Sequence, residues 1–345
     1  MQYTKLGTTE LEVSRICMGC MGFGDASSGQ HRWTVDETHA RQIIRRGLEM
    51  GINFFDTAIA YQSGTSEQYL GRALRDFARR DEVVVATKFL PCTKEEIAAG
   101  ISGEQHVARM LDRSLQNLGT DYVDLYICHM WDYQTPLPEI MRGLDRAVRS
   151  GKARYIGISN CFAWQLEKAG TLAADQGLTP FVAVQGHYNL IFREEEREMV
   201  PCCRAENIAL TPYSPLAGGR LARRGDGSSR RARQDDYAAL KYRAARQMDQ
   251  PIIDRVEKLA RQRGVGMPEI ALAWLLTKVA APVVGMTKPQ HLQGAVQATE
   301  ITLTKAEIAY LEELYQPHPL VGVMAQNTPE TAGQKQVWST GAQHI

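Results

Sequence analysis

The feature that most constrains the fold is a regular alternation of short apolar runs with helical patterns. Eight runs have the composition of buried strands, and apolar residues at helical spacing separate most of them. Eight strands that alternate with helices predict a parallel (β/α)8 barrel, the TIM-barrel fold, in one domain. The eight runs lie near residues 16–18, 53–55, 83–86, 123–127, 154–158, 182–184, 209–211 and 282–284.

Three further segments do not fit this repeat. Residues 2–13 are expected to form a hairpin that caps the bottom of the barrel. About 70 residues separate the seventh strand from the eighth and include a basic loop, residues 220–246, with nine Lys or Arg against three Asp. This loop is either a solvated segment or a lid that meets a polyanionic ligand. Residues 1–323 are expected to form the barrel domain, followed by a polar C-terminal tail, residues 324–345.

Polar side chains stand at the ends of three successive strands. The apolar run 52–55 ends at Asp56, and Tyr61 follows five residues later. The next strand ends in Lys88 and the one after it in His129. Because the carboxyl ends of the strands converge on one mouth of a barrel, we expect these four side chains to meet there.

Such a group suits the delivery of a proton to a carbonyl oxygen. A free tyrosine has a pKa of about 10, and a nearby ammonium lowers the pKa of a phenol. Asp56 can hold Lys88 charged, and His129 can bind the substrate oxygen. Proton donation alone does not reduce a carbonyl, so the site also needs a source of hydride.

Each residue alone has a plainer interpretation. Asp56 could cap a helix, Tyr61 could pack a loop, and His129 could be a core histidine. Lys88 could be half of a salt bridge, or the amine of a Schiff-base enzyme. Their order along the chain, each at or just after a strand end, favours catalysis.

Composition excludes several other classes of protein. A net charge of +1 gives no global reason to expect nucleic acid as a partner, and 44% apolar residues suffice for a core. No apolar run approaches the roughly 20 residues that span a bilayer, and no signal peptide is evident, so a cytoplasmic protein is expected. The seven cysteines suit reduced thiols; Cys17 and Cys20 form a CxxC pair without partners, so no metal is expected.

Several motifs together resemble the aldo-keto reductases, over about residues 2–323. They are NFFDTAIAY, the strand-end Lys88, DLYICHMWD, GKARYIGISN, VQGHYNLIFREEEREM, TPYSPLAGGRL and ALAWLL. The similarity is greatest to a bacterial branch akin to aryl-alcohol dehydrogenases, which also holds a reductase linked to 1-deoxyxylulose 5-phosphate. The resemblance implies a barrel fold, reduction of small carbonyl compounds, and Asp56, Tyr61, Lys88 and His129 as a catalytic tetrad.

The resemblance also implies NADPH/NADP+ as cofactor and places it at the barrel mouth. No GxGxxG fingerprint is present. The nicotinamide would meet side chains at strand ends, Tyr213 would stack on its ring, small residues after the seventh strand would line the pyrophosphate, and Thr287 and Lys288 would meet the 2′-phosphate. The implied cofactor residues are Cys20, Met21, Ser159, Asn160, Gln185, Tyr213, Ser214, Leu216, Gly218, Arg220, Gly285, Thr287, Lys288 and His291.

The substrate is less constrained. Trp33 and Trp131 lie on loops expected at the mouth, which favours aldehydes with an aromatic or apolar body over small polar ketones; the plainer interpretation is that both only brace loops. Other functions remain open: a non-catalytic NADPH-binding regulatory subunit, a phosphate-sugar enzyme of the deoxyxylulose type, and a Schiff-base lyase. The sequence does not determine the oligomeric state.

Overall fold

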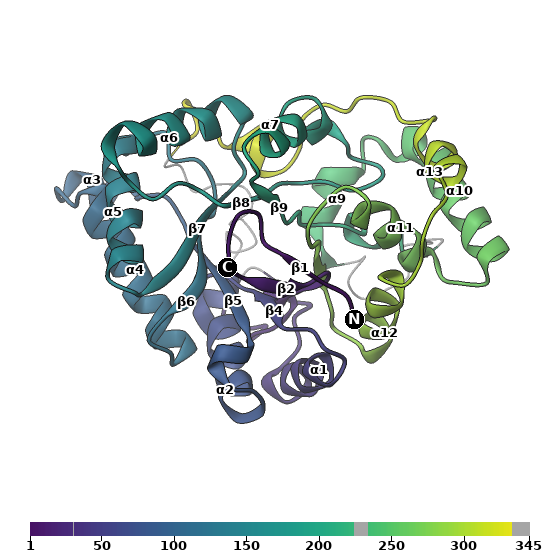
Figure 1. Cartoon of the computed structure of the whole chain (residues 1–345), viewed down its shortest axis with the longest axis horizontal. Coiled ribbons are helices and arrows are strands. Elements are labelled where there is room, and N and C mark those ends of the chain that lie inside the picture. Colours follow the sequence, from purple (N-terminus) through teal and green to yellow (C-terminus); the bar gives the residue numbers. More distant parts are fainter. Residues whose placement is uncertain (30, 224–233, 333–345) are drawn as a thin grey trace.

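Eight parallel strands form the expected barrel in the computed structural model, which describes residues 1–29, 31–223 and 234–332 (Figure 1). The strand order is β10-β3-β4-β5-β6-β7-β8-β9. Backbone bonds from Ala280 to Leu210 (3.1 Å) and from Val283 to Pro212 (2.9 Å) link the two edges of this sheet. The strands are β3 (Cys17–Gly19), β4 (Phe54–Asp56), β5 (Val84–Phe89), β6 (Val123–Cys128), β7 (Ala153–Ser159), β8 (Ala183–Gln185), β9 (Ala209–Leu210) and β10 (Val283–Gly285).

Helices surround the barrel, as their apolar faces predict. In α4, for example, Val107, Leu111 and Leu115 are buried, Ser102 caps the start, and Gly119 ends the helix in the left-handed region at φ 65°. The helices are α1 (Glu37–Glu49), α2 (Thr65–Phe77), α3 (Lys94–Ala98), α4 (Gly103–Leu118), α5 (Leu137–Arg149), α6 (Ala163–Gln176), α7 (Met199–Ala205), α9 (Asp236–Tyr242), α10 (Arg246–Arg263), α11 (Met267–Leu276), α12 (Pro289–Ala298), α13 (Lys305–Glu312) and α14 (Val323–Gln326).

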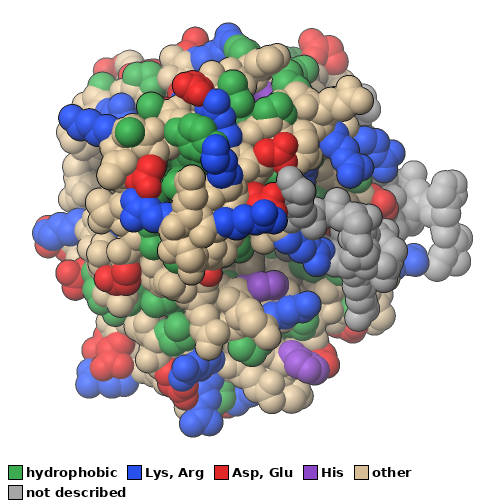
Figure 2. Space-filling view, turned by 90° about the vertical axis from the view of Figure 1, so that its right-hand side faces the viewer, with side chains coloured by type: hydrophobic (Ala, Val, Ile, Leu, Met, Phe, Trp, Pro, Cys, Tyr) green, Lys and Arg blue, Asp and Glu red, His purple; other side chains and the backbone are tan. Residues whose placement is uncertain are grey.

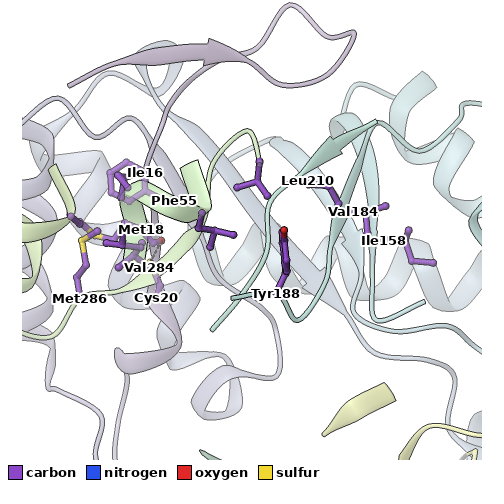
Figure 3. Packing of buried hydrophobic residues seen from close by; sticks show 14 of the residues in the cluster. Ile16, Met18, Cys20, Phe55, Ile158, Val184, Tyr188, Leu210, Val284 and Met286 are labelled. Carbon is purple, nitrogen blue, oxygen red and sulfur yellow. Dashed lines mark hydrogen bonds between the residues drawn. The ribbon is translucent and has the colours of Figure 1, made fainter. Parts of the chain in front are cut away.

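Alternate residues of each strand enter two different cores, because side chains on a strand point to opposite faces. One set, including Phe54, Val84, Leu125 and Ile127, fills the barrel interior. The other set packs outward against the helices. Figure 3 labels ten residues of this outer core, among them Met18 on β3, Ile158 on β7 and Val284 on β10.

A two-stranded antiparallel hairpin, β1 (Tyr3–Lys5) and β2 (Glu12–Ser14), closes the bottom of the barrel. Leu6, Leu11 and Val13 are almost fully buried and belong to the same cluster as the inward-facing strand residues. The hairpin crosses the centre of the barrel in Figure 1. The expected cap is therefore present, and it seals the end opposite the strand C-termini.

The long segment after β9 contains α9, α10 and α11. Of the predicted basic loop, Arg224, Arg230, Arg231 and Arg233 lie outside the described residues. In the described part, Arg220 pairs with Asp249, which is fully buried in α10. On the face shown in Figure 2, Lys and Arg side chains are interspersed with Asp and Glu.

The start of the C-terminal tail packs on the barrel domain. The Asn327 amide donates to the backbone carbonyl of Trp131 at 2.8 Å, and Gln134 donates to the carbonyl of Ala332 at 3.0 Å. Residues 323–332 therefore lie against the loop after β6. Residues 333–345 of the predicted tail lie outside the described residues. No helix among the described residues is both long and apolar enough to cross a membrane.

Candidate active site

The strand alternation that fills the barrel interior also places a layer of polar side chains at its open end. Each of these residues follows an inward-facing strand residue by two positions, so it points inward as well. The layer lies above the apolar core at the C-terminal ends of the strands, which is where barrel enzymes carry their active sites. Its members are Asp56, Lys88, His129, Ser159 and Gln185.

A buried ion pair forms the centre of this layer. Lys88 Nζ donates to Asp56 Oδ1 at 2.6 Å and to the backbone carbonyl of Thr57 at 2.7 Å. Gln185 Nε2 donates to the other carboxylate oxygen of Asp56 at 2.9 Å. The side chains of Lys88 and Asp56 are 0% and 2% exposed. Both charges are therefore shielded from water and held by fixed partners, which makes the ammonium position well defined.

Tyr61 extends this pair toward the mouth. It begins a short 3-10 helix, Tyr61–Gly64, and Lys88 Nζ donates to its hydroxyl at 3.3 Å. The Tyr61 and His129 rings lie edge to face with centroids 5.8 Å apart. Thus the four side chains that the sequence singled out meet at one place, although they come from three strands and a loop.

The pKa values in this group depend on burial as well as charge. Burial raises the pKa of Tyr61, and Lys88 opposes that rise only in part. Burial lowers the pKa of Lys88, but Asp56 and Tyr61 outweigh it and the net shift is upward. Burial and Lys88 together lower the pKa of His129 to about 3. At neutral pH Tyr61 is therefore a protonated phenol, Lys88 an ammonium and His129 a neutral imidazole.

These values correct one sequence expectation. Lys88 was expected to lower the pKa of Tyr61 below that of a free phenol, but desolvation of the phenol has a larger effect on this pKa than the ammonium has. What Lys88 provides is a donor that already touches the Tyr61 oxygen and would stabilise negative charge appearing there.

A second polar row lies beside the tetrad. Asn160 Nδ2 donates to the carbonyl of His129 (2.9 Å) and to Ser159 Oγ (2.8 Å), and Tyr213 donates to Asn160 Oδ1 (2.9 Å). Ser159 Oγ donates to the carbonyl of Gln185 at 2.8 Å. The structure therefore brings four of the expected cofactor residues into one hydrogen-bonded row beside the tetrad.

The sequence interpretation missed two side chains next to Tyr213. The His187 ring is stacked on the Tyr213 ring, with centroids 5.4 Å apart and an angle of 11°. Lys241, 5% exposed, donates to Ser214 Oγ at 2.8 Å and lies 5.2 Å from the Tyr213 ring centroid. His187 follows Gln185 by two positions, so strand alternation could have found it. Lys241 comes from α9, and no local pattern indicated its place.

The loop after β9 adopts an unusual backbone. Ser214, Ala217 and Gly218 have φ values of 55°, 50° and 64°, a region that residues with a side chain rarely adopt. Gln62, Ser63 and Asn160 also have positive φ and flank the tetrad. Backbone held in this region often marks a functional site. Leu216 lies in the same turn and Arg220 just after it, where its guanidinium is paired with Asp249.

The remaining expected cofactor residues follow β10 and β3. Gly285 ends β10, and Thr287 N–H donates to His291 Nδ1 at 3.3 Å. Lys288 is exposed and immediately precedes α12. Cys20 and Met21 form a turn after β3 with Gly22, where an added Cβ would lie 2.7 Å from the Thr287 methyl. The two turns therefore touch at one side of the mouth.

The CxxC pair is part of the core. Cys17 and Cys20 are fully buried, and burial raises both thiol pKa values.

The two tryptophans expected at the substrate follow different strands. Trp33 lies after β3 and Trp131 after β6, three places further along the sheet. Trp33 is 7% exposed and lies near Gly22 and His31. Trp131 is 8% exposed, its ring centroid is 6.2 Å from that of Trp164, and it borders a small apolar cavity with Phe89 and Cys128. The lining of this cavity includes Phe89, Cys128 and Ile158 of the outer core and none of the four tetrad residues.

Comparison with known proteins supplies the family. The model of the aldo/keto reductase family matches residues 15–316, so the chain belongs to the aldo-keto reductases. It is 37% identical to versiconal hemiacetal acetate reductase of Aspergillus parasiticus (92% of this chain, 99% of that protein). It is 33% identical to the putative aryl-alcohol dehydrogenase AAD16 of Saccharomyces cerevisiae (92% and 98%).

A solved structure gives the same result. The thermostable aldo-keto reductase Tm1743, determined in complex with the inhibitor epalrestat, superposes with a TM-score of 0.72 at 29% identity, covering 91% of this chain and 100% of that one. The protein is a carbonyl-reducing oxidoreductase of a family that uses nicotinamide dinucleotides. The relatives named here do not confirm the expected bacterial branch, since both are fungal.

Proposed function

We propose that this protein is an NADPH-dependent reductase of aldehydes and ketones in which Tyr61 donates the proton. One observation carries the proposal: a single buried ammonium, Lys88 Nζ, contacts both the Asp56 carboxylate and the Tyr61 hydroxyl. A structural salt bridge would need only the first contact. The second places a positive charge where a phenolate would appear after proton transfer, which is the requirement for general acid catalysis by a tyrosine.

Each residue of the tetrad then has a distinct task. Tyr61 gives its hydroxyl proton to the substrate oxygen as negative charge develops there. Lys88 stabilises the phenolate that remains, and Asp56 and the Thr57 carbonyl keep the ammonium in place. His129, neutral because its pKa is about 3, can donate an N–H to the substrate oxygen without adding a charge. The nicotinamide dinucleotide, when bound, supplies the hydride.

The chemistry of the mouth fits such a cofactor. Ser159, Asn160 and Gln185 offer polar groups for an amide, and Tyr213 offers an aromatic ring beside them. The left-handed turn after β9 lets backbone approach a pyrophosphate closely. At the start of α12, exposed Lys288 and the nearby Thr287 and His291 suit an anionic group, because a helix N-terminus favours negative charge. In this proposal they hold the 2′-phosphate of NADPH.

Lys288→Ala should weaken NADPH binding about tenfold or more and leave NADH binding nearly unchanged. A charge-assisted hydrogen bond to phosphate contributes about 1.5–3 kcal/mol, and NADH lacks that phosphate. Fluorescence titration of both cofactors measures the two Kd values. Lys305→Ala, at the first position of α13, is the control for loss of a surface charge. An equal loss for both cofactors would refute the 2′-phosphate role.

We also propose that aldehydes with an aromatic or apolar body are preferred, with Trp131 as one wall of the substrate pocket. Trp131 follows His129 by two residues, and an indole gives a large apolar surface for stacking. The dehydrogenase name of the yeast relative refers to aryl alcohols, which agrees with this substrate class.

Trp131→Ala should lower kcat/KM for nitrobenzaldehyde about tenfold and change that for a small aliphatic aldehyde far less. Steady-state oxidation of NADPH with both aldehydes and a sugar phosphate measures this selectivity. Trp164→Ala is the matched control, since it removes the neighbouring indole, which is 55% exposed. The same loss in both variants would mean that the two rings only brace the loop. A wild type that favours the sugar phosphate would overturn the preference.

A further inference from the structure

A Cys, a Glu and a His converge between the loop after β5 and the helices that follow it. Cys92 lies in the loop, Glu96 in α3 and His106 in α4. Their candidate ligand atoms, one from each residue, all lie within 4.8 Å of one another. Cys92 and His106 are 2% exposed, whereas the Glu96 side chain is 16% exposed. The cluster is therefore buried, with one edge near the surface.

Surrounding contacts orient these three side chains toward a common point. His106 Nε2 donates to the backbone carbonyl of Leu90 at 2.8 Å, which turns Nδ1 toward the cluster. Nδ1 is buried with Glu96 Oε2 3.1 Å away, and the ring also interacts with the Cys92 side chain. With its proton on Nε2, the imidazole presents a lone pair to a carboxylate oxygen. Two acceptors at this distance repel unless a proton or a cation lies between them.

We propose that Cys92 Sγ, Glu96 and His106 Nδ1 form a site for a thiophilic divalent cation of the Zn²⁺ class. Thiolate, imidazole and carboxylate are the ligands that Zn²⁺ takes in proteins, usually with tetrahedral geometry. Three protein ligands leave a fourth position for water. The bond from His106 Nε2 to a backbone carbonyl is the outer contact that metal-bound histidines typically make.

The site is separate from the tetrad but connected to the substrate side of the mouth. The Cys92 N–H donates to Asp132 Oδ2 at 3.3 Å, and Asp132 follows Trp131 in the loop after β6. Glu96 also accepts from the Thr93 N–H at 2.8 Å and pairs with Arg109. A bound cation would tie the loop after β5 to α3 and α4. It would therefore stabilise this part of the chain and take no part in the reduction.

Binding of Co²⁺ and Zn²⁺ to the full-length, metal-free protein tests this site. Wild type should bind one Zn²⁺ per chain in competition with a chromophoric chelator, and Co²⁺ should give a thiolate-to-metal charge-transfer band. Cys92→Ser should lose the band. Cys202→Ser should keep it; Cys202 is the control because its thiol, 3.1 Å from a Glu167 oxygen, is the more accessible alternative site. A band lost in Cys202→Ser and kept in Cys92→Ser would overturn the proposal.

A second variant guards against misfolding of the buried cysteine substitution. Glu96→Gln lies at the edge of the cluster, and a glutamine can still complete the capping box that Glu96 makes with Thr93. It should weaken Zn²⁺ binding by at least about tenfold, because loss of even an outer partner costs 10–100-fold. Zn²⁺ should raise the Tm of wild type by a few degrees and that of Glu96→Gln less. If wild type binds no Zn²⁺ and its Tm does not change when Zn²⁺ is added, the cluster is only a hydrogen-bonded His–Glu pair beside a thiol.

Discussion

Tyr61→Phe should lower kcat/KM for aldehyde reduction at least about 10²-fold, the scale of general acid catalysis. The substitution keeps the ring against His129 and removes only the hydroxyl that Lys88 contacts at 3.3 Å. The loss should appear in kcat, since the proton is delivered in the chemical step, while the Kd for NADPH changes little. Stopped-flow measurement of single-turnover NADPH oxidation, together with a cofactor titration, separates the two effects.

The control for this substitution is Tyr69→Phe on α2. Tyr69 is partly exposed and its ring lies near Arg72, so removing its hydroxyl leaves the mouth untouched. That variant should retain wild-type rates. Near-native reduction by Tyr61→Phe would show that another group, or water, supplies the proton, and the proposed tetrad would be wrong.

Lys88→Met should lower the free energy of unfolding by about 3–5 kcal/mol, in addition to abolishing most of the activity. Methionine fills similar space but leaves the Asp56 carboxylate, 2% exposed, without its cation. An unpaired buried charge is costly, whereas an intact buried pair contributes little net stability. Urea unfolding at neutral pH measures the loss.

The double variant Asp56→Asn with Lys88→Met distinguishes charge from packing. It removes both charges and retains a side-chain amide near Gln185, which bonds Asp56 at 2.9 Å in the wild type. We expect it to be more stable than Lys88→Met alone by about 1–3 kcal/mol, a coupling typical of contacting residues. The two losses in the free energy of unfolding caused by Lys88→Met and Asp56→Asn alone can be added. If the double variant loses that full sum, the pair does not act as a unit and Lys88 is held by other contacts.

The barrel and the tetrad could be predicted because both depend on local pattern. Apolar runs such as 123–127 mark strands, and the polar residue at the end of a parallel strand must lie at the shared mouth. Strand alternation then fixes the direction of each side chain. Asp56, Lys88 and His129 each follow an inward-facing residue by two positions and therefore also point inward. The closing hairpin was predictable for the same reason, since the bottom of a barrel needs an apolar cover.

Other features depend on segments that meet only in three dimensions. Arg220, which the resemblance places at the pyrophosphate, forms an ion pair with Asp249, 29 residues away on α10, and its role toward the cofactor stays a prediction. Lys241, counted as one charge of a basic loop, is instead buried beside Tyr213. Likewise Cys92, Glu96 and His106 have no recognisable ligand spacing and converge because α3 and α4 fold back on the loop after β5.

By itself, the sequence determined the barrel, the order of the strands and the four residues at its mouth, because side-chain periodicity and strand polarity are encoded locally. Only the tertiary structure decided how these residues behave. The pKa of Tyr61 is raised and that of His129 falls to about 3, because burial outweighs the charge of the ammonium for the phenol and adds to it for the imidazole. Desolvation depends on every segment packed around a group, and no single stretch of sequence contains that information.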